Sequence, residues 1–232
     1  GRHSGCQLEF GPDGYLWVGT GDTAVGTIPQ DLQSLGGKVL RVDRDGNPAP
    51  GNLGAPFDPR IYSYGHRNIQ GLAFFDTARW DGTALGISVE HGTSRDDEVN
   101  ALLPGNYGWD PVPGYNEARP MTDLARYPDA HTALWSSGDP TLATSGAVVL
   151  SGPQWGAWDQ AVAVAAQKAS RLIILELNPD MSLRRETHLF TGEFGRLRTA
   201  QQGPDGSLYL LTDNGSGRDR ILRVTAGLPG VG

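Results

Sequence analysis

The chain has 232 residues, and glycine (33) and proline (16) together fill about a fifth of its positions, which is typical of a folded protein rich in turns. No apolar run approaches the roughly 18 residues that a membrane-spanning helix needs, and the net charge of −7 argues against a nucleic-acid-binding domain, which carries a basic face. The single cysteine, Cys6, excludes an intrachain disulfide framework and a metal site built from cysteines.

The first predicted element is a β-hairpin. Residues 7–10 and 15–18 have the alternating or β-prone side chains of strands, and the turn sequence Gly-Pro-Asp-Gly at 11–14 separates them. The same phrase returns at 203–210, where Gly-Pro-Asp-Gly again comes before a leucine and an aromatic residue. Further strands are predicted at residues 38–42, 86–89, 146–150, 161–165, 171–177 and 220–224.

Short strands with turn residues between them and a recurring hairpin phrase predict an antiparallel all-β protein. A β-propeller fits this pattern better than a two-sheet sandwich, because propeller blades carry periodic glycine and aromatic motifs. Blades of roughly 40 to 50 residues would give this chain four or five of them. We therefore interpret residues 1–232 as a single propeller domain.

His3 and Asp22 flank the first hairpin and are the first candidates for chemistry. Histidine is the usual general base near neutral pH, and a carboxylate on its second ring nitrogen fixes the tautomer and raises its basicity. A hairpin brings its two ends together, so the two side chains can meet. The alternative is a disordered terminal histidine and an ordinary turn aspartate.

A second candidate is the segment 65–71, which places Arg67, Asn68 and Gln70 between glycines. Such a loop offers many hydrogen-bond donors from a backbone that can approach a ligand closely. The alternative is a polar turn at the edge of a blade.

The acidic stretch 90–98 follows a predicted strand and combines a glycine with several carboxylates. Hard cations such as calcium bind carboxylate and backbone carbonyl oxygens, so a calcium loop is one interpretation. The stretch lacks the spacing of an EF-hand loop, and a solvated acidic turn is the alternative.

Arg196 and Arg198 give the strongest signal from residue chemistry. The period of two in a strand puts both guanidinium groups on one face and Leu197 on the other. Two adjacent positive charges repel unless an anion lies between them, and arginine prefers planar carboxylate or phosphate partners. The anion can be a bound ligand or a carboxylate of the protein. Lys168, at a predicted strand connection, is either an ordinary surface lysine or a further contact of this kind.

Several phrases, taken in chain order, match one known family. By residue number they are 2–5 with 10–14, 21–22, 37–41, 64–68 with 70–71, 90–92 with 97–100, 105–109, 195–198 and 211–213. Together they resemble the aldose sugar dehydrogenases that depend on pyrroloquinoline quinone (PQQ), the soluble glucose and sorbosone dehydrogenase family of six-bladed propellers. Family members carry further blades before the segment that matches His3. The resemblance therefore implies an incomplete propeller with about four blades in this chain, and further sequence in front of it.

The resemblance also implies roles for the candidate residues. The family histidine that matches His3 is the general base, the aspartate that matches Asp22 orients it, and Arg67 matches an arginine beside the reactive quinone carbonyl. Calcium would bind the backbone carbonyls of Gly92 and Thr93, with Asp97 supporting that loop. The residues that match PQQ contacts are Arg67, Asn68, Gln70, Thr141, Lys168, Arg196 and Arg198. Because PQQ carries three carboxylates, an acidic protein needs such a local cationic patch to bind it.

The leading functional hypothesis is an oxidoreductase that uses PQQ and Ca²⁺ to oxidise an aldose to its lactone and passes electrons to an external acceptor. The family implies a periplasmic or secreted location, and neither the sugar nor the oligomeric state follows from the sequence. One alternative is a propeller that only binds ligands, or an inactive fragment. The other is a metal-dependent lactonase, which would use clustered carboxylate and amide ligands rather than Lys168, Arg196 and Arg198.

Overall fold

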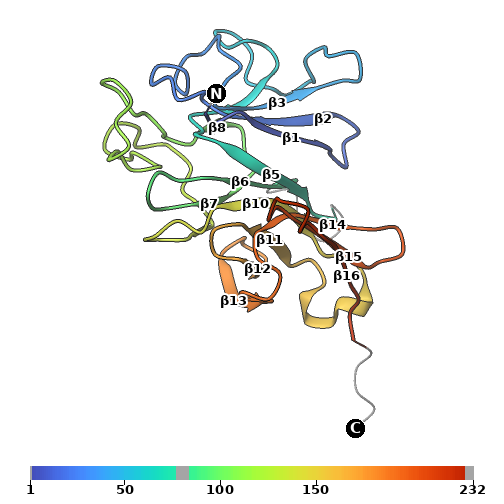
Figure 1. The fold of residues 1–232 in the computed structure, drawn as a ribbon. Helices are drawn as coiled ribbons and strands as arrows, with labels where there is room; N and C mark the ends of the chain where they lie inside the picture. The colour runs from blue at the N-terminus through green and yellow to red at the C-terminus, as the bar shows by residue number, and fades with distance from the viewer. Residues whose placement is uncertain (1, 77–83, 228–232) are drawn as a thin grey trace. The chain divides into compact units, whose positions relative to one another are not determined.

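The computed structural model describes residues 2–76 and 84–227. These residues form strands β1 to β16 and the 3-10 helix η1 (Pro153–Trp158) (Figure 1). The strands make four sheets, which lie in two compact units, Gly1–Thr141 and Leu142–Gly232, called the first and second unit below. Within the described part of the chain, no helix is long and apolar enough to cross a membrane.

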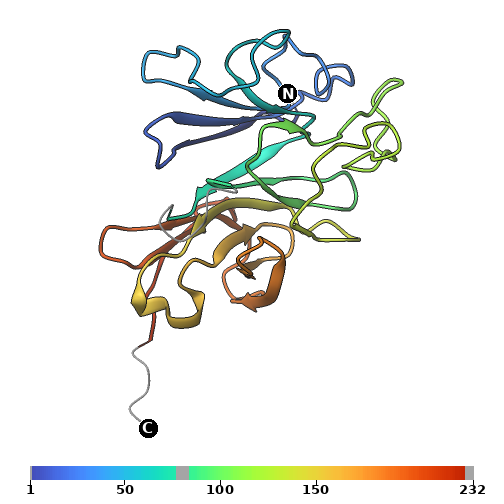
Figure 2. The ribbon, with the colours of Figure 1, turned by 180° about the vertical axis from the view of Figure 1, so that it is seen from behind.

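The first unit contains two sheets, and Figure 2 shows the first hairpin of this unit from behind. All neighbouring strands are antiparallel except β4 and β8, which are parallel. The first sheet has the order β1 (Gly5–Phe10), β2 (Leu16–Thr20), β3 (Lys38–Val42), β4 (Ile61–Tyr64), β8 (Gly105–Asn106). The second has the order β5 (Ile69–Phe74), β6 (Gly86–Glu90), β7 (Glu98–Ala101), β9 (Trp135–Ser136).

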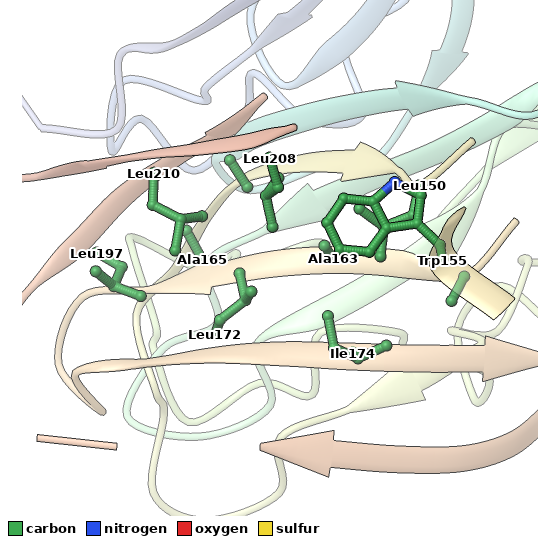
Figure 3. Packing of buried hydrophobic residues seen from close by; sticks show 11 residues of the cluster. Leu150, Trp155, Ala163, Ala165, Leu172, Ile174, Leu197, Leu208 and Leu210 are labelled. Carbon is green, nitrogen blue, oxygen red and sulfur yellow. The ribbon is translucent and has the colours of Figure 1, made fainter. Parts of the chain in front are cut away.

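The second unit also contains two sheets, both fully antiparallel. One has the order β10 (Thr144–Val149), β11 (Val162–Ala166), β12 (Arg171–Leu177), β13 (Leu183–Leu189). The other has the order β14 (Leu197–Gln202), β15 (Leu208–Thr212), β16 (Ile221–Val224). Apolar side chains from both sheets and η1 form one buried cluster, which includes Leu150, Trp155, Ala163, Ala165, Leu172, Ile174, Leu197, Leu208 and Leu210 (Figure 3).

Two strands of the second unit, β11 and β13, differ in burial and in how clearly the sequence predicts them. β11 is buried on both faces and consists only of valine and alanine, whereas β13 is an edge strand whose charged side chains are mostly exposed. Charged residues on an edge strand discourage pairing with other chains, but they also remove the apolar alternation. The sequence therefore predicts β3 and β12 with their observed bounds and gives no sign of β13.

The all-β prediction and the recurring hairpin are both confirmed. Residues 7–10 lie in β1 and residues 16–18 of the predicted 15–18 lie in β2, and the second Gly-Pro-Asp-Gly turn connects β14 to β15. The four sheets have three to five strands each, like the blades of a propeller, and match the predicted number of about four. The interpretation of residues 1–232 as one domain stays a prediction.

Each sheet has an irregularity at the same place. In the pairing of its first two strands, the register shifts near the start of the first strand, between Gly5 and Gln7, Ile69 and Gly71, Thr144 and Ala147, or Leu197 and Thr199. β-Bulges of this kind redirect side chains and are frequent next to active sites. Gln70 and Arg198, two of the predicted site residues, lie within these shifts.

Candidate active site

His3 and Asp22 meet at the open end of the first hairpin, as the hairpin geometry predicts. His3 lies before β1 and Asp22 lies after β2, and the backbone N–H of Thr23 donates to the carbonyl of His3 at 3.3 Å. His3 Nδ1 is 2.8 Å from Asp22 Oδ1. The Asp22 side chain is fully buried and that of His3 is 10% exposed, so the pair is largely shielded from water.

Four donors surround the carboxylate of Asp22. Oδ1 accepts hydrogen bonds from His3 Nδ1 and from the backbone N–H of Ala24, both at 2.8 Å. Oδ2 accepts from Trp109 Nε1 at 2.8 Å and from the Tyr115 hydroxyl at 2.6 Å. A carboxylate has about four acceptor positions, so Asp22 has no free position for a proton of its own. The proton of the neutral His3 ring therefore belongs on Nδ1, which leaves Nε2 as the basic nitrogen.

Tyr115 and Trp109 belong to this site, although the sequence did not mark them as site residues. Trp109 follows β8, and Tyr115 lies in the strand-free stretch between β8 and β9. Burial raises the pKa of Tyr115, and its hydrogen bond to the negative Asp22 raises it further, so the hydroxyl stays protonated. Trp109 lay inside a matched phrase, but nothing in the spacing of the sequence points to Tyr115.

Arg67 is buried at the start of the second sheet. Its Nη1 donates to the carbonyl of His91 at 3.1 Å and to that of Gly92, and its Nη2 is 3.6 Å from a carboxylate oxygen of Glu117. Its guanidinium carbon lies 5.7 Å from the ring centre of Trp109. The Nε atom is buried and hydrogen-bonded to none of the residues that the structure describes. The guanidinium group thus retains donor capacity for a further acceptor.

A buried polar network holds the backbone of Arg67. Glu90 Oε2 accepts the N–H of Arg67 at 2.8 Å, and Oε1 accepts from His66 Nδ1 and Asn100 Nδ2, both at 3.0 Å. His66 Nε2 is in turn 2.9 Å from the Ser63 hydroxyl. These side chains are all at most 5% exposed, so the glycine-flanked segment is not the polar surface turn of the alternative interpretation. Strand pairing explains this, because the segment leads directly into β5.

The acidic stretch is also more buried than a solvated turn. Glu90 and Glu98 face each other across β6 and β7, and both are at most 5% exposed. Burial, followed by the charge of Glu90, raises the pKa of Glu98 to about 8. Asn100 Nδ2 contacts both carboxylates, at 3.0 and 3.3 Å. The alternative interpretation did not foresee β7, which begins at Glu98 and pairs with β6.

The loop between these strands is held by a buried aspartate and needs a glycine at position 92. The N–H of Gly92 donates to Asp97 Oδ1 at 2.9 Å, which fixes the loop around a fully buried carboxylate. A Cβ at position 92 would lie 2.0 Å from the carbonyl oxygen of Arg95, so only glycine fits. The backbone N–H of Thr141 donates to the carbonyl of Ser94 at 3.1 Å, which puts this predicted contact beside the loop.

Thr93 follows Gly92 in this loop and is partly buried. Among residues 2–76 and 84–227, no three His, Cys, Asp or Glu side chains are grouped so that they could hold a metal ion. Backbone carbonyl oxygens are also possible ligands of a hard cation.

Asn68 connects the two sheets of the first unit through hydrogen bonds. Its Oδ1 accepts the backbone N–H of Gly5 and the Nε2 of Gln70, both at 3.0 Å. The backbone N–H of Asp22 donates to the carbonyl of Arg67 at 2.9 Å. The structure thus places Arg67, Asn68 and Gln70 next to the His3–Asp22 hairpin end.

The remaining predicted residues lie in the second unit and are exposed. Lys168 lies in the turn between β11 and β12, Arg196 comes just before β14, and Arg198 lies in its bulge. Leu197 is fully buried between the two arginines, as the alternation predicts. Arg196 lies beside a protein carboxylate, with its Nη2 3.9 Å from Asp213 Oδ2 and its Nε donating to the carbonyl of Asp213 at 3.1 Å. Arg198 forms no ion pair with any described residue.

Comparison with known proteins identifies the family. A family model described as glucose / sorbosone dehydrogenase matches residues 1–223. The chain belongs to this family. The glucose / sorbosone dehydrogenase relatives include the aldose sugar dehydrogenase YliI of Escherichia coli (strain K12), which is 30% identical over 97% of this chain and 60% of that protein.

Two solved structures are also similar to this member of the glucose / sorbosone dehydrogenase family. The PQQ-bound aldose sugar dehydrogenase of Streptomyces coelicolor is 35% identical with a TM-score of 0.74, over 95% of this chain and 61% of that one. The soluble aldose sugar dehydrogenase of Escherichia coli, in its apo-form, is 27% identical with a TM-score of 0.81, over 98% and 65%. The chain thus spans less than two thirds of these relatives, and their similarity confirms the predicted family and propeller-type fold.

Proposed function

We propose that this protein oxidises an aldose sugar at its anomeric carbon to the lactone, with PQQ as the hydride acceptor and Ca²⁺ beside it. The observation that carries the proposal is the His3–Asp22 pair, in which Nδ1 is held by a carboxylate and Nε2 is left as the base. The 35% identity to a PQQ-bound aldose sugar dehydrogenase supports the choice of cofactor and substrate class.

In this proposal, His3 does the proton chemistry. Nε2 takes the proton of the anomeric hydroxyl while hydride leaves the anomeric carbon, so the C–O bond becomes the carbonyl of the lactone. Asp22 keeps the ring oriented and stabilises the imidazolium that forms, since it accepts the Nδ1–H at 2.8 Å. Positioned general bases contribute about 10²- to 10⁴-fold to a rate.

The residues of the chain fit PQQ by their chemistry. When bound, PQQ supplies an electrophilic quinone carbon for the hydride, and Ca²⁺ polarises the neighbouring carbonyl. Arg67 has a buried Nε without a described partner, as expected of a group that donates to a ligand oxygen. Arg198, exposed and without an ion pair to described residues, fits a ligand carboxylate. The proposed PQQ contacts are Arg67, Asn68, Gln70, Thr141, Lys168, Arg196 and Arg198.

The loop after β6 fits Ca²⁺. The proposed ligands are the carbonyls of Gly92 and Thr93, with Asp97 holding the loop through the N–H of Gly92. Calcium prefers oxygen ligands of this kind. The carbonyl of Gly92 also accepts from Arg67, and because a carbonyl oxygen has two lone pairs it can serve both groups.

The test is a calorimetric titration of the protein with PQQ in the presence of Ca²⁺, followed by dye-linked oxidation of a set of aldoses. We expect binding heat and turnover, both lost when a chelator removes Ca²⁺. Arg198→Met should weaken PQQ binding about tenfold, because a charge-assisted hydrogen bond is lost. Arg185→Met is the control, since that arginine is also exposed but lies on the edge strand β13.

A protein that takes up PQQ without oxidising any aldose would indicate a binding module. Absence of both heat and turnover would reject the proposal. We further propose an external electron acceptor and a periplasmic or secreted location, which rest on the family alone. Fractionation of cells that express the protein would test the location.

A further inference from the structure

We propose that Tyr115 is a positioning residue for the base His3, a role that rests on the proposed function. Its hydroxyl is 2.6 Å from Asp22 Oδ2 and 2.9 Å from His3 Nδ1. Tyr115 is 93 residues from Asp22 and 112 from His3, in a stretch without strands. One hydroxyl from a remote loop therefore contacts both members of the pair.

The direction of these hydrogen bonds follows from the donors present. The hydroxyl has one proton, and Asp22 only accepts, so the proton points to Oδ2. The oxygen of Tyr115 then presents a lone pair to the Nδ1–H of His3. Nδ1 thus faces two acceptors, Asp22 Oδ1 at 2.8 Å and Tyr115 Oη at 2.9 Å.

Two acceptors fix the orientation of the His3 ring, whereas one acceptor does not. A single hydrogen bond leaves the ring free to turn about the N–H···O line, whereas two acceptors at different points fix the plane of the ring. A flipped ring would turn a C–H group toward both oxygens. This matters for His3 because it precedes β1 and is not held by strand pairing. A fixed ring directs Nε2 toward one place, which a general base requires.

The loop around Tyr115 is itself anchored near His3. The ring of Tyr115 packs edge-on against buried Trp109, with centroids 6.1 Å apart and an interplanar angle of 70°. Two residues further on, Glu117 hydrogen-bonds Arg2, the neighbour of His3 in the chain. It also lies 3.6 Å from the guanidinium of Arg67. The contact of Tyr115 is therefore part of a wider attachment of this loop to the site.

The test compares Tyr115→Phe with Tyr127→Phe. The Tyr127 hydroxyl donates to the buried Asp110 at 2.7 Å in the same strand-free stretch, so its loss removes a similar bond without touching His3. Histidine labelled with nitrogen-15 reports each of the five imidazoles by NMR, and His3→Gln assigns the signal of His3. We expect a slowly exchanging Nδ1–H at His3 in the wild type and in Tyr127→Phe, and a shifted, rapidly exchanging one in Tyr115→Phe.

Kinetics supply the second readout. Tyr115→Phe should lower kcat about tenfold with KM changed by less than about twofold, because the misdirected base slows the chemical step more than binding. A His3 signal and a kcat like those of Tyr127→Phe would reduce Tyr115 to a structural role and overturn the proposal.

The NMR arm does not depend on turnover, so it decides this inference even if no aldose is oxidised. If Tyr115→Phe does not fold, the wild-type spectrum still decides. The proposal requires a protected Nδ1–H at His3 that correlates through space with the ring protons of Tyr115, and the lack of that signal would refute it.

Discussion

Residues 3–24 and 195–216 form two similar hairpins, and only the first contains the His–Asp pair. Their residue numbers differ by 192, as for Asp13 and Asp205 in the two Gly-Pro-Asp-Gly turns. Both turns close with the same hydrogen bond of 2.9 Å, from the fourth residue to the first. Equivalent residues share a positive φ, namely His3 and Gly195, Thr23 and Gly215, and Ala24 and Ser216.

The copies differ in the side chains at their open ends. His3 and Asp22 of the first copy correspond to Gly195 and Asn214 of the second. Asp22 accepts from the ring of His3, whereas the side chain of Asn214 bonds to backbone groups, accepting the N–H of Arg196 and donating to the carbonyl of Phe194, both at 2.9 Å.

At the first of these positions, occupied by His3 or Gly195, the backbone requires only a residue with a positive φ. Glycine adopts φ of 76° without strain, whereas a histidine at φ of 54° costs on the order of 1 kcal/mol. The copy that carries this cost is the one that holds the candidate base. A histidine held at a left-handed φ where the equivalent residue is glycine supports the proposal that His3 serves function.

The largest expected effect on activity comes from replacing His3 by glycine, the residue at the equivalent position of the second copy. His3→Gly should lower kcat by about 10²- to 10⁴-fold, because the general base is removed. The free energy of unfolding should fall by less than for Asp22→Asn, because glycine relieves the left-handed strain while the buried Asp22 loses one of its four donors. Dye-linked aldose oxidation and urea unfolding measure the two effects, and His3→Gln separates loss of the ring from the gain of glycine.

The reverse exchange, Gly195→His, serves as the matched control. It should lower stability, since a Cβ at position 195 would lie 2.2 Å from Asn214 Oδ1. A His3→Gly variant that keeps full turnover would remove the functional distinction between the copies.

The next largest effect is a loss of stability at the second pair of equivalent positions, Asp22 and Asn214. Asp22→Asn turns one acceptor oxygen into a donor that faces existing donors, and we expect a loss of about 2 to 4 kcal/mol in the free energy of unfolding. Asn214→Asp puts an oxygen opposite the carbonyl of Phe194, but the site is partly exposed, so the loss should be about 1 kcal/mol. Equal losses of unfolding free energy for Asp22→Asn and Asn214→Asp in urea would show that the deeper burial of Asp22 does not make the first copy more sensitive.

Much of this comparison was visible in the sequence. The repeated Gly-Pro-Asp-Gly phrase predicted both hairpins, and hairpin geometry brought His3 to Asp22, because a turn joins residues that are near in the chain. Strands such as β3 were predicted because their apolar residues are buried, whereas β13 presents charged residues at a sheet edge.

The contacts that could not be predicted are those between distant segments. Tyr115 reaches Asp22 from a loop without periodicity, and Glu90 is buried because β6 pairs with β7. Composition alone made the acidic stretch look solvated, since pairing between strands decides burial and no local pattern records it.

The smallest expected effect lies at the turns, where the copies are most alike. Asp13 and Asp205 each bind an aromatic residue four positions later, Trp17 Nε1 at 3.2 Å and the Tyr209 hydroxyl at 3.0 Å. Asp13 also pairs with Arg41, whose side chain is only 12% exposed. Asp13→Ala should therefore cost about 1 to 2 kcal/mol of unfolding free energy, and Asp205→Ala clearly less, because its surroundings are open to solvent.

The stabilisation by Asp205 should also depend on pH. The backbone N–H of Ser207 is the main cause that lowers the pKa of Asp205 from its ordinary value of 3.8. A lowered carboxyl pKa stabilises the folded state above the ordinary value, and this stabilisation is lost as the pH falls through the lowered pKa. The difference in melting temperature between wild type and Asp205→Ala should thus be constant from about pH 5 to pH 7 and shrink below about pH 4. A difference that stayed constant on acidification through the lowered pKa would mean that the turn aspartate acts through its shape rather than its charge.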